Sequence, residues 1–255
     1  MPKTIALAGK GGTGKTTIAA FLIHLITQRT RSPILAIDAD PAMNLHLALG
    51  MPTPTTVGAI REEMSEVVHQ KQLGVAISRH DYLQHEVQMA LEEGEKIDLL
   101  AMGRPEGQGC YCAANHLLRT VVDDIGKSYD FVVVDNEAGM EHISRRTTRD
   151  VDVLLVVSDP TVRGLRAAEV ILALADDIEV NVHNKMLVLN RVVNELPDTF
   201  KQEMDSLDVE IGALIPADPN INELDVKGMP LVTLTGDSPA YRTIEELVEK
   251  ILKLI

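Results

Sequence analysis

The chain has 255 residues and a formal net charge of −14, with 45% hydrophobic and 24% charged residues. These values are typical of a globular protein and exclude a disordered or fibrous chain. Because DNA binding requires clustered Lys and Arg side chains, the negative charge predicts no nucleic-acid partner. No run of 18 apolar residues occurs, and the N-terminus lacks a signal-peptide pattern, so we expect a cytoplasmic protein with no membrane partner.

Short apolar runs alternate with segments of helical spacing along the chain. Runs that are apolar at nearly every position, such as Phe131–Asp135, are typical of parallel strands covered on both faces. The predicted strands are Thr4–Ala8, Pro33–Ile37, Asp98–Met102, Phe131–Asp135, Val153–Val157, Met186–Asn190 and Glu210–Ile215. The predicted helices are Thr16–Thr30, Ala113–Lys127, Gly164–Asp176 and Ile244–Leu254.

This alternation predicts an α/β fold, with a mostly parallel sheet of about seven or eight strands and helices on both faces. No linker or internal repeat interrupts the pattern, so we expect a single domain over residues 1–255. The segment Pro52–Glu95 mixes weak helical spacing with Pro, His and charged residues. We expect helices and loops there, at the rim of the sheet.

A glycine-rich segment lies between the first predicted strand and the first predicted helix. It reads Gly9-Lys-Gly-Gly-Thr-Gly14-Lys15-Thr16 and fits the P-loop pattern G-x-x-x-x-G-K-[ST]. Backbone N–H groups of such a loop, together with the helix N-terminus, form a cradle for phosphate. Lys15 is predicted to contact the β- and γ-phosphates, and the Thr16 hydroxyl to bind Mg²⁺. The predicted nucleotide-binding residues are Gly11, Gly12, Thr13, Gly14, Lys15, Thr16 and Thr17.

Lys10 follows the first glycine of this loop and gives the sequence K-G-G-T-G-K-T-T. With that lysine, the segment resembles the deviant P-loop family that contains MinD, ParA, the nitrogenase iron protein and metal-insertion ATPases. The resemblance implies the P-loop NTPase fold, hydrolysis of ATP to ADP, and a homodimer in which Lys10 reaches the phosphates of the partner's nucleotide. Lys10 would then stabilise the transferring phosphoryl group, as an arginine finger does.

Two strand ends resemble the switch segments of the same family. Ile37-Asp38-Ala39-Asp40-Pro41 looks like switch I, which implies that Asp40 orients the attacking water and that Asp38 lies close to Mg²⁺. The apolar run ending at Asp135 is similar to a Walker B strand, whose carboxylate would hold Mg²⁺. The following residues, Asn136 to His142, resemble switch II, where Gly139 would sense the γ-phosphate.

Adenine recognition is predicted at two strand ends that match places where this family contacts the base. The predicted contacts are Asn190, Arg191, Pro216 and Asp218. An Asn side chain offers both a donor and an acceptor, which suits the amino edge of a purine. Because Asn is also a common turn residue, a purely structural role for Asn190 stays open.

Cys110 and Cys112 are the only cysteines in the chain, and they precede a predicted helix. In a reducing compartment a structural disulfide is disfavoured, whereas a helix N-terminus favours the thiolate that binds metal. Two thiolates make an incomplete site, and a symmetric dimer supplies four. We therefore predict a metal site shared across a dimer. Nickel, zinc and a [4Fe–4S] cluster all remain open as occupants.

The segment Met102–Cys112, M-G-R-P-E-G-Q-G-C-Y-C, resembles nickel-insertion accessory ATPases of the CooC type. The resemblance implies ATP, Mg²⁺ and Ni²⁺ as ligands. Because zinc binds four thiolates at least as readily as many competitors, zinc is a second expected occupant of the purified protein. It also implies a client nickel enzyme, either carbon monoxide dehydrogenase or acetyl-CoA synthase. An iron–sulfur redox ATPase and a MinD/ParA-type positioning ATPase are the alternatives. The segment Thr243–Ile255 is amphipathic but carries more Glu than Lys, so its apolar stripe is predicted to pack on the sheet.

Overall fold

The computed structural model of the chain describes residues 1–60, 62–63, 79–103, 120–139, 150–177 and 181–255. Its strands form one parallel sheet of seven strands in the order β3-β2-β4-β1-β5-β6-β7. The strands are β1 (Lys3–Gly9), β2 (Ile34–Asp38), β3 (Ile97–Ala101), β4 (Phe131–Asp135), β5 (Asp150–Ser158), β6 (Asn181–Val192) and β7 (Glu210–Pro216). The predicted α/β class and parallel sheet are confirmed.

Side chains of the central strands are buried on both faces of the sheet. Every residue of β2 and of β4 is buried, as the continuous apolar runs predict. Successive side chains of a strand point to opposite faces. In β1, Ile5 and Leu7 belong to one hydrophobic cluster, whereas Ala6 and Ala8 belong to the other. The sheet therefore separates two cores.

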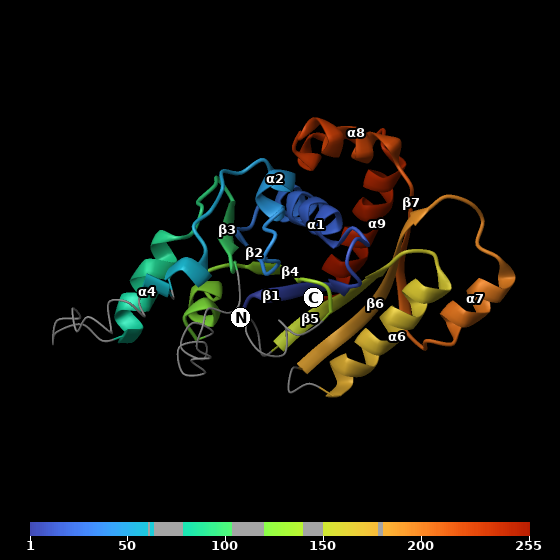
Figure 1. Cartoon of the computed structure of the whole chain (residues 1–255), viewed down its shortest axis with the longest axis horizontal. Helices are drawn as coiled ribbons and strands as arrows, with labels where there is room; N and C mark the ends of the chain where they lie inside the picture. The colour runs from blue at the N-terminus through green and yellow to red at the C-terminus, as the bar shows by residue number, and fades with distance from the viewer. Residues whose placement is uncertain (61, 64–78, 104–119, 140–149, 178–180) are drawn as a thin grey trace.

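Helices cover both faces, as Figure 1 shows. One core contains buried residues of α1 (Lys15–Thr30), α2 (Leu45–Leu49), α9 (Pro239–Leu254) and the 3₁₀ turn η2 (Leu231–Thr233). The other contains residues of α4 (Arg79–Met89), the helical residues 120–126, α6 (Val162–Asp177) and α7 (Asp198–Asp205). The helix α8 (Pro219–Lys227) has no fully buried residue, but its partly buried Ile221 and Leu224 pack against the first of these cores.

The C-terminal helix α9 packs against α1 and β7. Six of its residues are buried, and Tyr241 meets the ring of Phe21 edge-on, with ring centroids 6.0 Å apart. The apolar stripe of α9 thus lies in the core, as predicted. In the part of the chain that the structure describes, none of the helices combines the length and the apolar character needed to cross a membrane.

Because all the strands are parallel, their carboxyl ends meet at one edge of the sheet. Gly9, Asp38 and Asp135 end three neighbouring strands at this edge. Ligands of open α/β sheets bind at the carboxyl ends of the strands. The fold therefore brings together the residues that the sequence singles out far apart along the chain.

Candidate nucleotide-binding site

The loop from Gly9 to Thr16 joins β1 to α1 in a conformation that requires glycine. Gly12 and Gly14 have positive φ angles of 79° and 92°. A Cβ atom at Gly9 would lie 2.2 Å from the carbonyl oxygen of Val157 on the adjacent strand β5. The glycines of the predicted P-loop thus allow a backbone conformation that other residues adopt only with strain. A loop needs such a conformation to present successive N–H groups to an anion.

Lys15 begins α1 and lies across the loop. Its side chain is buried, and Nζ donates hydrogen bonds to the carbonyl oxygens of Gly9 at 3.3 Å and Lys10 at 3.4 Å. Burial lowers the pKa of Lys15, and the carboxylates of Asp135, Asp40 and Glu137 oppose that shift in part. A bound phosphate would offset the same cost of burying the cation.

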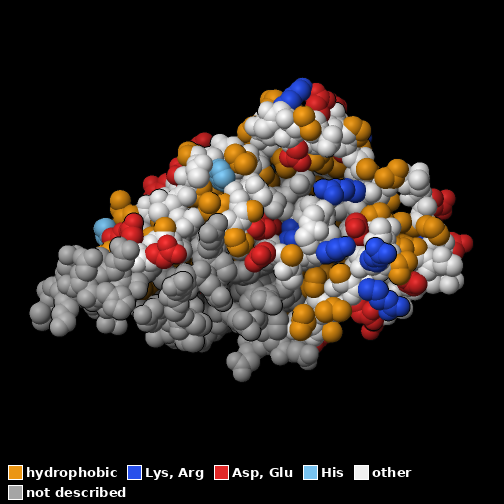
Figure 2. All heavy atoms as spheres, in the orientation of Figure 1, with side chains coloured by type: hydrophobic (Ala, Val, Ile, Leu, Met, Phe, Trp, Pro, Cys, Tyr) orange, Lys and Arg blue, Asp and Glu red, His pale blue; other side chains and the backbone are white. Residues whose placement is uncertain are grey.

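Lys10 presents its side chain to solvent. Its carbonyl oxygen accepts hydrogen bonds from the loop, but the described residues leave its ammonium group unpaired. Although the chain is negatively charged, several Lys and Arg side chains lie on the face of the molecule that Figure 2 shows, in the half that carries α6 and β6.

Thr16 and Asp135 meet at the carboxyl edge of the sheet. Thr16 Oγ1 donates a hydrogen bond of 2.6 Å to Oδ2 of Asp135, whereas the buried Oδ1 of Asp135 has no partner among the residues that the structure describes. Burial raises the pKa of Asp135 to about 7, and Asp38 and Asp40 add to the shift, against Thr16 and Lys15. A buried acceptor without a partner calls for a ligand or water. Hydroxyl and carboxylate oxygens are the donors that Mg²⁺ prefers, so the pair fits this cation.

Asp38 holds the loop that follows β2. Its Oδ1 accepts a hydrogen bond from the Asp40 N–H at 3.1 Å, and its Oδ2 accepts one from the Leu45 N–H at 3.0 Å. Burial raises the pKa of Asp38 to about 6. Asp40 is half-buried, and its Oδ1 accepts from the Ala42 N–H at 2.8 Å. The structure brings Asp38 and Asp40 beside the P-loop, with Asp38 setting the position of Asp40.

The segment after β4 is tied to β1. The Gly139 N–H donates to the carbonyl oxygen of Gly9 at 3.2 Å, and Gly139 has a positive φ of 102°. Asn136 is buried, and its Nδ2 donates to the carbonyl oxygen of Leu7 at 2.8 Å. Sequence reasoning gave Asn136 no role of its own, and its polar side chain after a buried strand was the available signal. Residues 140–142 of the predicted switch lie outside the described residues.

Three of the four predicted base-contacting residues have side-chain hydrogen-bond partners within the chain. Asn190 Nδ2 donates to the carbonyl oxygen of Thr13 at 2.8 Å, and an Arg191 guanidinium nitrogen donates to that of Gly12 at 2.9 Å. Pro216 ends β7 and is half-buried. Asp218 caps α8 through the Asn220 N–H and accepts from Ser238 Oγ; although burial opposes the shift, these bonds lower the pKa of Asp218.

The cysteine pair Cys110 and Cys112 lies outside the described residues. The described chain reaches Gly103, just before this segment, and the Met102 N–H donates to the carbonyl oxygen of Asp38 at 2.8 Å. Among the described side chains, His, Cys, Asp and Glu form no group of three or more that suits a metal ion. The shared metal site therefore remains a prediction from the sequence.

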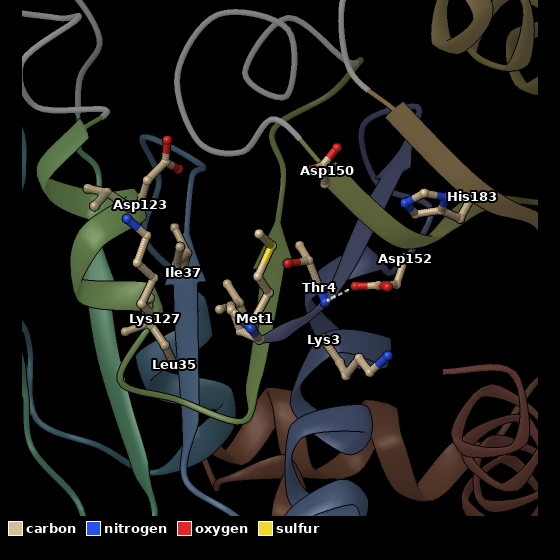
Figure 3. Close-up of a pocket in the computed structure, with 14 residues that line it drawn as sticks. Met1, Lys3, Thr4, Leu35, Ile37, Asp123, Lys127, Asp150, Asp152 and His183 are labelled. Atoms are coloured by element: carbon tan, nitrogen blue, oxygen red, sulfur yellow. Dashed lines mark hydrogen bonds between the residues drawn. The ribbon is translucent and has the colours of Figure 1, made fainter.

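A cavity of about 690 Å³ lies near the amino ends of the strands, away from the P-loop (Figure 3). Its wall includes Asp123, Asp152 and His183, with Leu35 and Ile37 from β2. Asp152 uses Oδ2 to accept the Thr4 N–H at 2.7 Å. Of the predicted site residues, none lines this cavity.

Comparison with known families decides between a chance P-loop and a P-loop protein. Residues 4–231 match the CobQ/CobB/MinD/ParA nucleotide binding domain. The chain belongs to this family. It is accordingly a P-loop ATPase of the MinD/ParA type, as the lysine-bearing loop predicts.

The matches to similar proteins cover nearly the whole length of this member of the CobQ/CobB/MinD/ParA family. An uncharacterized ATP-binding protein of Methanocaldococcus jannaschii is 42% identical over 97% of this chain and 98% of its own. The carbon monoxide dehydrogenase accessory protein CooC of Rhodospirillum rubrum is 31% identical over 93% of this chain and 91% of its own. The cell division ATPase MinD of Pyrococcus furiosus has a TM-score of 0.71 at 25% identity, covering all of both chains.

Proposed function

We propose that this MinD/ParA-family ATPase is an ATP-dependent nickel chaperone. In this proposal two chains form a homodimer that holds nickel between Cys110 and Cys112 of each chain and delivers it to a nickel enzyme. Carbon monoxide dehydrogenase and acetyl-CoA synthase are the candidate clients. Two features support the proposal: the C-x-C motif within Met102–Cys112, and the 31% identity to a carbon monoxide dehydrogenase accessory protein.

In this proposal a backbone hydrogen bond connects the nucleotide site to the metal-binding segment. The Met102 N–H donates to the carbonyl oxygen of Asp38 at 2.8 Å, and the carboxylate of Asp38 holds the N–H groups of Asp40 and Leu45. The cysteine-bearing segment thus starts at the loop that faces the phosphates. A rearrangement of that loop on ATP hydrolysis would move the start of the metal-binding segment, because the two share this hydrogen bond.

The nucleotide chemistry follows from the residues of the P-loop edge. Thr16 and Asp135 would hold Mg²⁺, which neutralises phosphate charge when it is bound. Lys15 would contact the β- and γ-phosphates of the same nucleotide. Asp40 would orient the attacking water, and the exposed Lys10 would reach the nucleotide of the partner chain. Dimerisation would then be required both for hydrolysis and for completing the metal site.

The similarity to MinD favours a second candidate, a positioning ATPase that acts through a partner surface. That role does not explain the cysteine pair. The apolar stripe of α9 lies in the core, so it is not exposed for binding a membrane surface. An iron–sulfur redox ATPase is the third candidate, since four thiolates suit a [4Fe–4S] cluster. A cluster would give the purified protein a brown colour that is lost on oxidation.

Anaerobic titration of the metal-free protein with Ni²⁺ tests the proposal. We expect thiolate-to-nickel charge-transfer absorption and about one metal per dimer. Both should disappear in the Cys110→Ser/Cys112→Ser variant, which should bind ATP as the wild type does. A Lys15→Ala variant is the matched control, because it should lose ATP binding and keep its cysteines. Equal nickel binding by the wild type and the cysteine variant would contradict the proposal.

A further inference from the structure

We propose that Asn136 is a positioning residue for ATP hydrolysis. In this proposal the amide of Asn136 fixes the point where the chain leaves β4, so that the N–H of Gly139 lies where it can meet the γ-phosphate. Asn136 itself would contact neither the nucleotide nor Mg²⁺. The inference rests on ATP hydrolysis by this MinD/ParA-type protein and on the predicted contact of Gly139 with the γ-phosphate, and not on nickel.

The side chain of Asn136 holds the end of β4 on β1. Leu7 pairs with Asp135 at the end of the ladder between these two strands. The carbonyl oxygen of Leu7 accepts the backbone N–H of Asn136 at 3.3 Å and its side-chain Nδ2 at 2.8 Å. A carbonyl oxygen has two lone pairs, so it can accept both bonds. The side chain thus supplies the shorter of the two bonds at the point where the ladder ends.

An amide is unfavourable at this position if the side chain serves packing alone. Asn136 is 1% exposed, and its Oδ1 has no hydrogen-bond partner among the residues that the structure describes. A buried acceptor without a partner costs about 1–3 kcal/mol. An apolar side chain of similar shape, such as leucine, would avoid that cost. Packing therefore does not explain the amide, whereas the bond from Nδ2 to Leu7 does.

The residues that follow Asn136 lie along the P-loop. A Cβ atom at Gly11 would lie 3.7 Å from Cβ of Ala138, which is an ordinary contact distance. Gly139 forms an isolated bridge with Gly9, and its N–H donates to the Gly9 carbonyl oxygen at 3.2 Å. This short segment is therefore attached to β1 at both of its ends.

The attachment at Gly9 is the one that a nucleotide would replace. The same carbonyl oxygen accepts Nζ of Lys15 at 3.3 Å. Lys15 and Gly139 are both predicted to contact the γ-phosphate, and a charged phosphate is a stronger acceptor than a neutral carbonyl. Both donors would turn from Gly9 to the phosphate, while Asn136 keeps the other end of the segment on Leu7. Without that anchor the segment would have to be ordered when ATP binds, which lowers the affinity for the γ-phosphate.

Nucleotide affinities separate this positioning role from a general role in folding. Dissociation constants for ADP and for the non-hydrolysable ATP analogue AMPPNP, each with Mg²⁺, are measured on the wild type and on Asn136→Leu, together with kcat for ATP. Leucine has nearly the shape of asparagine but no donor. We expect ADP to bind as in the wild type, the preference for AMPPNP over ADP to fall about fivefold, and kcat to fall by at least that factor.

Asn184→Leu is the matched control. Asn184 also donates from Nδ2 to a backbone carbonyl oxygen, that of Asp152 at 2.9 Å, but away from the P-loop. The control should leave both affinities and kcat unchanged. Asn136→Ala covers the case in which Asn136→Leu fails to fold, because alanine is smaller and also lacks the donor.

Equal losses of ADP and AMPPNP affinity in a folded variant would overturn the inference, because the amide would then act on the whole P-loop. Wild-type preference for AMPPNP, or a wild-type kcat, would overturn it as well. Failure of both variants to fold would assign Asn136 to the fold and also contradict the inference. If the wild type binds neither nucleotide, nucleotide binding by the P-loop is refuted, and the inference with it. Nickel is absent from all these measurements, so they leave the chaperone proposal untouched.

Discussion

The hydroxyl of Thr16 and the carboxylate of Asp135 share a hydrogen bond of 2.6 Å across a sequence separation of 119 residues. It joins the first turn of α1 to the end of β4. The second oxygen of the same carboxylate is buried, and the described part of the chain offers it no hydrogen-bond partner. The hydrogen bond thus brings a hydroxyl and a carboxylate together, and both are oxygen donors of the kind that Mg²⁺ binds.

Replacement of Asp135 by Asn should stabilise the metal-free protein at high pH. The folded-state pKa of Asp135 is about 7, above the ordinary value of 3.8. Between these values the native state binds more protons than the unfolded state, so stability falls as pH rises through this window. The amide avoids burying a charge, so the gain should be larger at pH 8 than at pH 5, by a difference on the order of 2 kcal/mol.

Urea unfolding at the two pH values, without metal or nucleotide, measures this effect. The raised pKa of Asp38, about 6, remains in the variant, so some pH dependence should persist. If the wild type and Asp135→Asn differ in free energy of unfolding by the same amount at pH 5 and at pH 8, Asp135 is not buried as described.

Lys10 is predicted to act on the nucleotide of the partner chain. Lys10→Ala should bind ATP and fail to hydrolyse it, and Asp40→Ala should do the same because the water is not oriented. Equal mixing of the two variants should restore about a quarter of the wild-type rate, since half of the dimers gain one complete site. Steady-state phosphate release measures the rate. A lysine that acts within its own chain would give no restoration.

Gly9→Ala should destabilise the fold, because its Cβ would lie 2.2 Å from the backbone oxygen of Val157 and force β1 from β5. Overpacking of this kind costs about 1–3 kcal/mol or more. Gly236→Ala is the matched control, since no atom lies within 4 Å of its Cβ position. Denaturant midpoints compare the two variants. Equal midpoints would contradict the close packing of the P-loop's first glycine on β5.

Gly103→Ala should weaken the proposed coupling between nucleotide and metal. Gly103 has a positive φ of 67°, and a Cβ atom there would lie 2.6 Å from Cβ of Thr56. The substitution would shift the chain beside Met102, which holds the Asp38 carbonyl. We expect ATP affinity to stay within about twofold while the effect of ATP on nickel affinity falls. Gly126→Ala is the control, because its added Cβ makes only an ordinary contact at 3.6 Å. Wild-type coupling in Gly103→Ala would count against the Met102–Asp38 link.

Much of the sheet could be predicted because its central strands are apolar at every position. β4 has the predicted bounds, and β2 differs by one residue at each end. β6 begins at Asn181, five residues before the prediction, because its first residues are polar and partly exposed. The helices α7 and α8 were not predicted, since both are short and each turns only two large apolar residues toward a core: Phe200 and Met204 in α7, and the partly buried Ile221 and Leu224 in α8.

The site shows where local patterns stop being informative. The P-loop was predictable because its residues are contiguous and its glycines have a backbone role. The partners of Asn190 were not, since Thr13 lies 177 residues away and only the parallel sheet brings them together. Asp218 similarly takes its partner Ser238 from the start of another helix. Strand-end position predicted that these residues lie at the nucleotide edge, but not which atoms they contact.

The most direct test of a metal site shared by two chains is native mass spectrometry of mixed dimers. Wild-type chains and mass-tagged Cys110→Ser/Cys112→Ser chains are mixed with ATP and Ni²⁺ under anaerobic conditions. The account predicts one nickel in dimers of two wild-type chains, and none in mixed dimers, which lack two of the four thiolates. Nickel retained by mixed dimers or by wild-type monomers would contradict a site shared between two C-x-C motifs.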